Sequence, residues 1–345
     1  MSAVAPAPAR ADWDGCGVTV DEVVDRLAAQ RRPADGGAPF LLAGVLNLVA
    51  YADEPSDLDV LQGVIEHLAD HQPSRSVVLC EQAGSRGIDA TVSTSCRLAG
   101  DHSGVAFELI RLTLRGDTRG GAASATVPLL RSDLPTVLWW PSAPDLSAGG
   151  TLARLAEIAD RVITESGRGP RAAETVRALA GWVPGAVPAV TDLAWAAITG
   201  WRQLIAQMVE GHPLERLRSG AAGATISHAE ATPGVGALLL AGWLRSLVGP
   251  GLMIETRARA TGGGTGLVAV ELEGSAGGRR LTVERIEGRA AAAVCVTEPD
   301  GKPQRRVLPL PHPDRTALLA GELELQRRDR AFERALQGAV AAGLA

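Results

Sequence analysis

The stretch at residues 134–145, LPTVLWWPSAPD, places Trp139 and Trp140 side by side at the end of an apolar run that Pro141 then breaks. The chain has only three Phe, one Tyr and seven Trp among 345 residues, so two adjacent indoles are unusual for it. In a strand, neighbouring side chains point to opposite faces. We therefore expect a strand over 135–140 with one indole in the core and the other on the opposite surface. Two interpretations stay open: core packing of a strand end, or contact of at least one indole with a partner or a domain interface.

Length and composition bound the class of protein. A chain of 345 residues suggests two domains, and its 46% hydrophobic content is normal for a soluble globular protein. A formal net charge of −5 without a basic block argues against nucleic acid or an anionic membrane as the main partner. The N-terminus lacks the basic start and apolar core of a signal peptide, and the longest apolar run, 235–244, has about half the length of a spanning helix. We therefore expect a cytoplasmic protein.

The first half of the chain alternates between helical and strand periodicity. Thr19 and Glu22 form a capping box for its first helix. Helices are expected at 19–31, 57–71 and 151–159, and strands at 40–51, 75–81, 88–98, 105–115, 135–140 and 161–166. This mixture of βαβ units and hairpins predicts an N-terminal α/β domain with a mixed sheet over 18–168, after a disordered N-terminus at 1–17.

The second half reads as a C-terminal α+β domain over 169–345. Helices are expected at 171–180, 192–209, 234–247, 313–327 and 329–343, and strands at 224–230, 252–260, 266–274, 279–287 and 292–298. The last four strands form a meander, so an antiparallel sheet is expected, with TGGGTG (261–266) as a hairpin turn. Gly200 favours a break or kink in the helix over 192–209. The chain as a whole is thus predicted to be α/β, or α+β overall.

No catalytic constellation stands out in the sequence. We find no phosphate loop and no nucleophile elbow, and His67 and His71 have helical spacing but no third ligand. We therefore predict no catalytic residue, no cofactor and no metal site, which favours a binding or assembly protein. Two alternatives remain. One is an enzyme or binding protein for a sugar phosphate or nucleotide, for which Arg111, Arg115 and Arg119 give a slight basis. The other is an interaction module with another partner.

Four cysteines lie at positions 16, 80, 96 and 295, and none has the CxxC spacing of a metal site. In a reducing cytoplasm we expect free thiols. A redox role for Cys80 and Cys96 is the alternative to packing.

Several blocks resemble the OpcA family, the glucose-6-phosphate dehydrogenase assembly proteins of actinobacteria and cyanobacteria. The most specific are VPLLRSDLPTVLWWPSAPD (127–145) with LARLAEIADRVITES (152–166), and TDLAWAAITGWRQLIAQ (191–207). Weaker blocks are VLNLVAY (45–51), PSRSVVL (73–79), VSTSCRL (92–98) and ALLLAGWLRSLVG (237–249). They occur in family order from about 45 to 249, and the tail after 250 matches more loosely. The cysteine pattern linked with redox control in cyanobacterial members is not matched here.

The resemblance implies a non-enzymatic partner of glucose-6-phosphate dehydrogenase. Such a protein would promote the active oligomer of the enzyme and so support NADPH production in the oxidative pentose phosphate pathway. A partner that binds the active assembly better than the inactive one shifts the population towards it, as an allosteric activator does.

Residues in the two most specific blocks are the candidates for partner contact. They are Trp139, Trp140, Pro141, Asp133, Arg131, Trp201 and Arg202. For Arg131 and Asp133 the alternative is a solvated or turn-capping role. Trp195 and Trp201 are six residues apart and so do not share a helical stripe, which makes one of them a core residue and leaves the other, beside Arg202, as a candidate contact.

Overall fold

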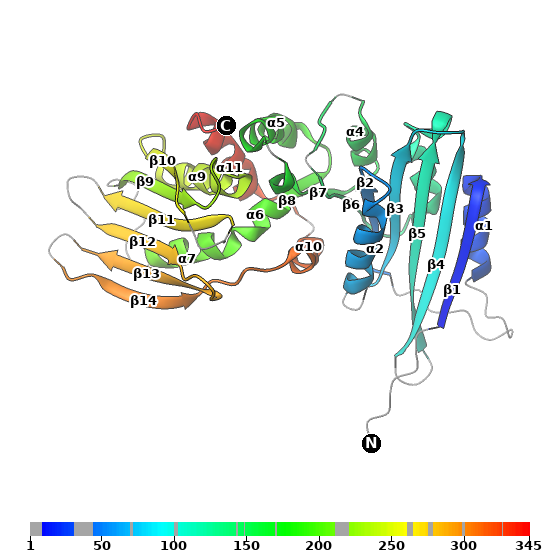
Figure 1. The fold of residues 1–345 in the computed structure, drawn as a ribbon, viewed down its shortest axis with the longest axis horizontal. Coiled ribbons are helices and arrows are strands. Elements are labelled where there is room, and N and C mark those ends of the chain that lie inside the picture. The colour runs from blue at the N-terminus through cyan, green and yellow to red at the C-terminus, as the bar shows by residue number, and fades with distance from the viewer. Residues whose placement is uncertain are drawn as a thin grey trace, which may run out of the picture. The chain divides into compact units, whose positions relative to one another are not determined.

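The chain divides into two compact units (Figure 1). The first consists of Met1–Thr164 with Val187–Ala189, and the second of Glu165–Ala186 with Val190–Ala345. The computed structural model describes residues 9–30, 44–69, 72–99, 103–142, 144–147, 149–169, 171–210, 221–260, 265–274, 279–298, 301–325 and 327–345. Helices and strands alternate in the first unit and a second sheet follows in the other, so the predicted α/β class is confirmed.

An eight-stranded sheet organises the N-terminal part, in the order β1-β4-β5-β3-β2-β6-β7-β8. Its strands are β1 (Ala9–Val18), β2 (Leu46–Ala52), β3 (Ser74–Gln82), β4 (Gly87–Ala99), β5 (Ser103–Arg115), β6 (Thr136–Trp140), β7 (Arg161–Thr164) and β8 (Ala189–Asp192). Its helices are α1 (Val20–Gln30), α2 (Asp57–Leu68), α3 (Ala122–Thr126) and α4 (Thr151–Ala156), with 3₁₀ turns at Gly116–Thr118 and Val127–Leu129. The predicted mixed sheet is therefore present.

The centre of this sheet is parallel. β3, β2, β6 and β7 run side by side in parallel register, and β2, β6 and β7 are buried along their whole length. Near-continuous apolar runs are typical of such strands because helices cover both faces. The chain leaves β2 through α2 towards β3, but leaves β6 through α4 in the opposite direction towards β7. The strand order thus reverses between β2 and β6, which is where open α/β sheets commonly bind ligands.

The N-terminus differs from expectation. We predicted disorder over 1–17, but β1 pairs antiparallel with β4, from Ala9 opposite Cys96 to Val18 opposite Ile88. The Thr91 hydroxyl also donates to the Asp14 carboxylate at 2.8 Å. An edge strand bonds to one neighbour only and needs few apolar residues, so its small and polar sequence resembled a tail. Residues 1–8 of the predicted tail lie outside the described residues.

Helix α1 begins with the predicted capping box. The Thr19 backbone N–H donates to Glu22 Oε2 at 2.7 Å, and the Glu22 backbone N–H donates to Thr19 Oγ1 at 3.3 Å. These bonds satisfy two of the free N–H groups of the first turn. The backbone hydrogen bond from Thr19 also lowers the pKa of the Glu22 carboxyl.

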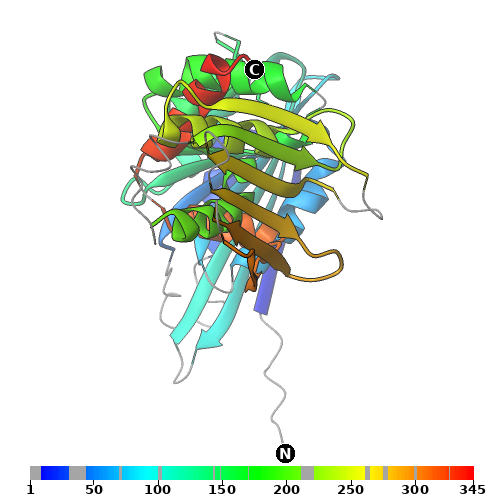
Figure 2. The same ribbon diagram turned by 90° about the vertical axis from the view of Figure 1, so that its left-hand side faces the viewer.

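The second unit contains a six-stranded sheet in the order β10-β9-β11-β12-β13-β14 (Figure 2). Its strands are β9 (Ala221–His228), β10 (Met253–Ala258), β11 (Leu267–Gly274), β12 (Arg280–Arg285), β13 (Ala291–Thr297) and β14 (Gln304–Pro309). Its helices are α5 (Ala172–Trp182), α6 (Leu193–Ala197), α7 (Thr199–Glu210), α9 (Val235–Val248), α10 (Arg315–Leu323) and α11 (Arg330–Ala341), with 3₁₀ turns at Ser166–Arg168 and Val183–Gly185.

The strand pairing corrects two expectations. β10 pairs in parallel with β9, and β11 pairs with the other side of β9. The sheet therefore has one parallel pair beside its antiparallel ones, and the segment 261–266 is not a hairpin turn, since the strands it joins are not neighbours. Of that segment, 261–264 lies outside the described residues. Strand β14 was not expected, because its arginines between prolines resemble a loop.

The predicted helix over 192–209 is two helices. The break lies at Ile198, which separates α6 from α7, two residues before Gly200. A Cβ at Gly200 would lie 2.9 Å from Leu310 Cδ1, so the glycine also permits a close approach. Strands β9 and β10 pack on α9, and β12 packs on α7. Among the helices of the described residues, none combines the length and the apolar character needed to cross a membrane.

Candidate functional site

The two tryptophans of β6 are both buried. Trp139 is 0% exposed and Trp140 is 4% exposed. Trp140 stacks on Tyr51 of the neighbouring strand β2, with ring centroids 4.4 Å apart and planes 2° from parallel. The expectation of one core and one surface indole does not match this burial, because both faces of a parallel sheet are covered. Pro141, the next residue, is also buried.

A hydrogen-bonded cluster surrounds Glu81 near the carboxyl end of β3. Glu81 Oε2 accepts from Thr151 Oγ1 at 2.9 Å and from the Tyr51 hydroxyl at 3.5 Å, while Oε1 accepts from the backbone N–H of Gly120. Burial, together with the charges of Glu81 and Asp53, raises the pKa of Tyr51 to about 12. Glu81 thus joins three separate segments of the chain where the strand order reverses.

Acidic residues dominate the turn that follows β2. Asp53 and Glu54 precede α2, and Asp57 and Asp59 lie in its first turn. A dinucleotide or phosphate site at such a turn uses glycines and the free N–H groups of the helix. Four carboxylates at that position repel a phosphate and already interact favourably with the helix dipole. This edge of the sheet is therefore unsuited to an anionic ligand.

Two of the three arginines that gave the sugar-phosphate alternative its basis are paired with carboxylates, whereas Arg119 follows the 3₁₀ turn at Gly116–Thr118 and is exposed. Arg111 and Arg115 lie in β5, not in loops. The Arg111 guanidinium is 2.8 Å from Asp59 Oδ1, and Arg115 forms an ion pair with Asp89. Their charges are therefore compensated within the first unit.

Two buried polar atoms near the end of β6 have no hydrogen-bond partner within the described residues. They are Nε1 of Trp140 and Oγ of Ser142. Such groups cost free energy unless a water or another group satisfies them.

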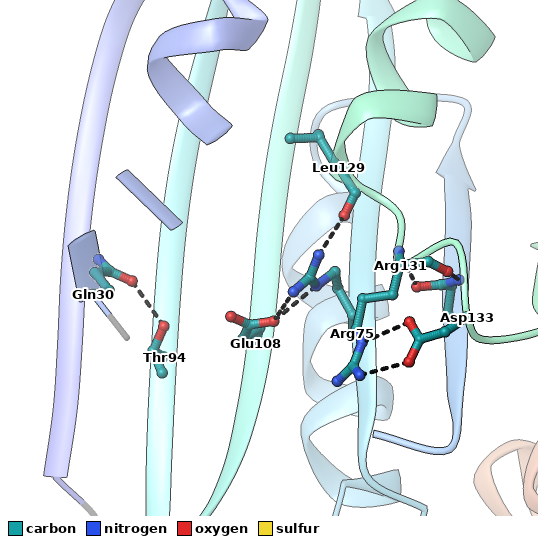
Figure 3. A network of polar contacts seen from close by, with 8 residues as sticks. Gln30, Arg75, Thr94, Glu108, Leu129, Arg131 and Asp133 are labelled. Carbon is teal, nitrogen blue, oxygen red and sulfur yellow. Dashed lines mark hydrogen bonds and ion pairs between the residues drawn. The ribbon is translucent and has the colours of Figure 1, made fainter. Parts of the chain in front are cut away.

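Arg131 and Asp133 lie at the opposite, amino end of the parallel strands (Figure 3). Their side chains form a two-bond ion pair, with Arg131 Nη2 2.8 Å from Asp133 Oδ2 and Arg131 Nε 3.2 Å from Asp133 Oδ1. The side chain of Asn47, fully buried in β2, accepts from the Arg131 backbone N–H and donates to the carbonyls of Arg131 and Leu134. These bonds fix the loop before β6, so the geometry gives Arg131 and Asp133 a turn-forming role.

A buried ion pair stands beside this loop (Figure 3). Arg75 Nε and Nη2 each lie 2.8 Å from Glu108 Oε2, and Nη1 donates to the Leu129 carbonyl at 3.1 Å. Both side chains are almost fully buried. The pair connects β3 and β5 with Leu129, which lies within the 127–145 block.

The strand register separates Cys80 from Cys96. Cys80 of β3 is opposite Thr113 of β5, and Thr113 is opposite Asp89 of β4. Asp89 is seven residues from Cys96, which at about 3.3 Å per residue is roughly 23 Å along the strand. A disulfide between them within one chain is therefore excluded. Burial also raises the pKa of the Cys80 thiol, which lowers its reactivity, and the side chain of Cys96 lies outside the described residues.

Trp201 and Arg202 lie in the second unit. Trp201 is buried, and Arg202 stacks on the buried Trp195, with its Cζ 3.6 Å from the ring centroid. The Trp195 indole N–H donates to Asp329 Oδ2 at 2.7 Å, and Asp329 caps α11. Burial lowers the pKa of the Arg202 guanidinium. Both tryptophans of the predicted block are thus core residues.

The predicted contact residues do not form one site. They divide among the two ends of the first sheet and the α6–α7 region of the second unit. Sequence patterns did not reveal the residues that hold these places together: Asn47, Tyr51, Arg75, Glu81, Glu108 and Asp329. One signal was readable, because Asn47 is a polar residue inside the apolar run VLNLVAY. Within the described residues, no group of three His, Cys, Asp or Glu side chains could hold a metal ion.

Comparison with protein families gives two matches that are consecutive along the chain. Residues 65–181 match the family model for the N-terminal domain of the glucose-6-phosphate dehydrogenase subunit, in the assembly family OpcA. Residues 188–336 match the OpcA family model for the C-terminal domain of the same glucose-6-phosphate dehydrogenase subunit. No curated protein matches the sequence.

Solved structures give remote likenesses. An oxidoreductase from Sinorhizobium meliloti is 9% identical with a TM-score of 0.44, over 87% of this chain and 95% of that one. A glucose-6-phosphate dehydrogenase in complex with glucose-6-phosphate is 8% identical with a TM-score of 0.43, over 89% and 92% of the two chains. A scyllo-inositol dehydrogenase from Lactobacillus casei is 10% identical with a TM-score of 0.38, over 87% and 95%. Similarities this low carry no argument about function.

Proposed function

The chain belongs to the OpcA family of glucose-6-phosphate dehydrogenase assembly proteins, and from this premise we propose that it binds that dehydrogenase and promotes its active oligomer. The observation that carries the proposal is the pair of family matches, at 65–181 and 188–336, which together include most of the chain. The protein would act in the cytoplasm and support NADPH supply through the oxidative pentose phosphate pathway.

The proposed mechanism requires binding only. An assembly protein that contacts the active oligomer more favourably than the inactive one shifts the equilibrium by the difference in the two binding free energies. The interior of the first unit supports such a role, because Glu81 at the reversal of strand order bonds to Tyr51, Thr151 and Gly120 and thereby stabilises the fold. A rigid partner loses little conformational entropy on binding.

The alternative, binding of a sugar phosphate or nucleotide, receives no support from the geometry. Two of its three candidate arginines, Arg111 and Arg115, are paired with Asp59 and Asp89, and the turn after β2 is acidic.

The test uses the purified chain and the dehydrogenase of the same organism. We expect light scattering after size-exclusion chromatography to show a complex in which the dehydrogenase has its active oligomeric size, and its rate per protomer to rise. If neither its mass nor its kinetics changes on mixing, the proposal fails. A rise in the melting temperature of this chain alone with glucose 6-phosphate or NADP would instead favour the alternative.

A further inference from the structure

Strand β14 forms a free edge of the second sheet (Figures 1 and 2). It pairs antiparallel with β13, from Ala291 opposite Pro309 to Val296 opposite Gln304. Its residues are exposed except for the half-exposed Leu308, and Val307 is 60% exposed. A free edge presents unpaired backbone groups that can pair with another strand.

The hydrogen-bond pattern shows which backbone groups face outwards. The Leu310 backbone N–H donates to the Ala290 carbonyl at 2.9 Å, and these residues continue the register of β13 and β14. In an antiparallel ladder every second residue bonds to the neighbour. Leu308 and Arg306 therefore bond inwards, while the N–H and C=O groups of Arg305 and Val307 point away from β13. Pro309, which has no N–H, occupies an outward position where none is needed.

The charge of this edge is opposite to that of the chain. Lys302, Arg305 and Arg306 are exposed and close in sequence, in a protein with a formal net charge of −5. In the described part of the chain none of the three has an ion pair, whereas Arg280 of the same sheet pairs with Glu273 at 2.6 Å. The edge thus combines free backbone groups with uncompensated positive charge.

We propose that β14 is a docking edge for an extended, acidic segment of the dehydrogenase, which adds to the sheet as a further strand. Main-chain bonds to Arg305 and Val307 would hold the segment, and Arg305 and Arg306 would select acidic side chains. A second copy of this chain is disfavoured, because pairing β14 with itself brings arginines together and like charges on paired strands repel. Charged edge residues keep most strands away, and an acidic strand is the class that these charges attract.

The inference rests on the proposed function, and one substitution tests it sharply. Val307→Pro removes an outward N–H without removing a hydrogen bond to β13, and Val307→Thr keeps that N–H as the matched control. With this chain and the dehydrogenase, we expect Val307→Pro to raise the dissociation constant of the complex about tenfold and Val307→Thr to leave it unchanged. The double variant Arg305→Glu with Arg306→Glu should raise the dissociation constant more than Val307→Pro does, and should reduce its dependence on salt concentration.

The outcomes separate the two proposals. If the unaltered chain does not bind the dehydrogenase, the proposed function fails. If it binds and both the proline variant and the double glutamate variant bind equally well, the docking edge is refuted while the function stands. Should Val307→Pro not fold, as judged by circular dichroism and melting, the double glutamate variant decides alone. If this chain forms a dimer and Val307→Pro dissociates that dimer, the edge binds a second copy of the chain and the proposal is overturned.

Discussion

Tyr51 and Trp140 stack face to face across the neighbouring strands β2 and β6, with ring planes 2° from parallel. The contact lies where the strand order of the first sheet reverses, a place that often holds a ligand in α/β folds. Here the two buried rings and the hydrogen bonds of Glu81 lie at that place. The tryptophan pair that dominates the sequence therefore contributes to the core.

Replacing Trp140 tests this core role. Trp140→Ala should lower the free energy of unfolding by about 3–5 kcal/mol, because it removes a buried indole and leaves a cavity. Trp140→Phe keeps an aromatic ring against Tyr51 and loses no hydrogen bond to the described residues, so the loss should be clearly smaller. Urea unfolding followed by circular dichroism measures both. We also expect Trp140→Phe to bind the dehydrogenase with unchanged affinity. Weaker binding by a fully folded variant would instead indicate that the Trp140 indole contacts the partner.

The ionisation of Tyr51 can be observed directly because it is the chain's single tyrosine. Its pKa is raised to about 12 mainly by burial, against an ordinary value of about 10. The native state thus retains the proton more strongly than the unfolded state. The resulting stability is complete below about pH 10 and is lost as the pH rises towards about 12. Ultraviolet titration of the phenolate should show this midpoint, and Glu81→Gln should lower it. A midpoint at the ordinary value would contradict the buried position.

Local signals predicted most of the fold. The capping box of Thr19 and Glu22 and the alternation of β4 and β5 act within a few residues, so their patterns can be read from the sequence. The edge strands β1 and β14 were missed because a strand with one neighbour needs few apolar residues. The parallel pairing of β10 with β9 was missed because the choice of neighbour depends on contacts across the sheet.

The candidate site was less predictable for the same reason. Asn47 and Arg131 are joined by hydrogen bonds although 84 residues separate them, and Trp195 and Asp329 although 134 residues separate them. No pattern in one sequence reports such pairs. Aromatic side chains in particular favour both cores and interfaces, so composition could not decide between burial and contact for Trp139 or Trp201.

Removing one partner of the buried pair Arg75 and Glu108 should lower the free energy of unfolding strongly, whereas replacing both with apolar residues should lower it little. Glu108→Gln leaves the guanidinium without its counter-charge, and we expect a loss of about 3–5 kcal/mol in the free energy of unfolding. The double variant Arg75→Met with Glu108→Leu removes both charges and should recover much of that loss. Denaturant unfolding of Arg75→Met, Glu108→Leu and the double variant measures the coupling between the two side chains. Additive losses would mean that the two side chains do not act as a pair.

The contact between α9 and α11 depends on two glycines. A Cβ at Gly242 would overlap the Ala335 carbonyl oxygen, and one at Gly338 would overlap the carbonyl oxygen of Gly242. Because backbone atoms cannot rotate away as a side chain can, Gly242→Ala must push the helices apart, and we expect it to destabilise the protein by at least about 1–3 kcal/mol. Gly321→Ala in α10 is the matched control, since a Cβ there meets nothing within 4 Å. The control should stabilise the protein by about 0.5–1 kcal/mol, because alanine loses less conformational freedom in a helix. Thermal and denaturant unfolding compare the two variants, and equal effects would show that the α9–α11 approach is looser than the geometry indicates.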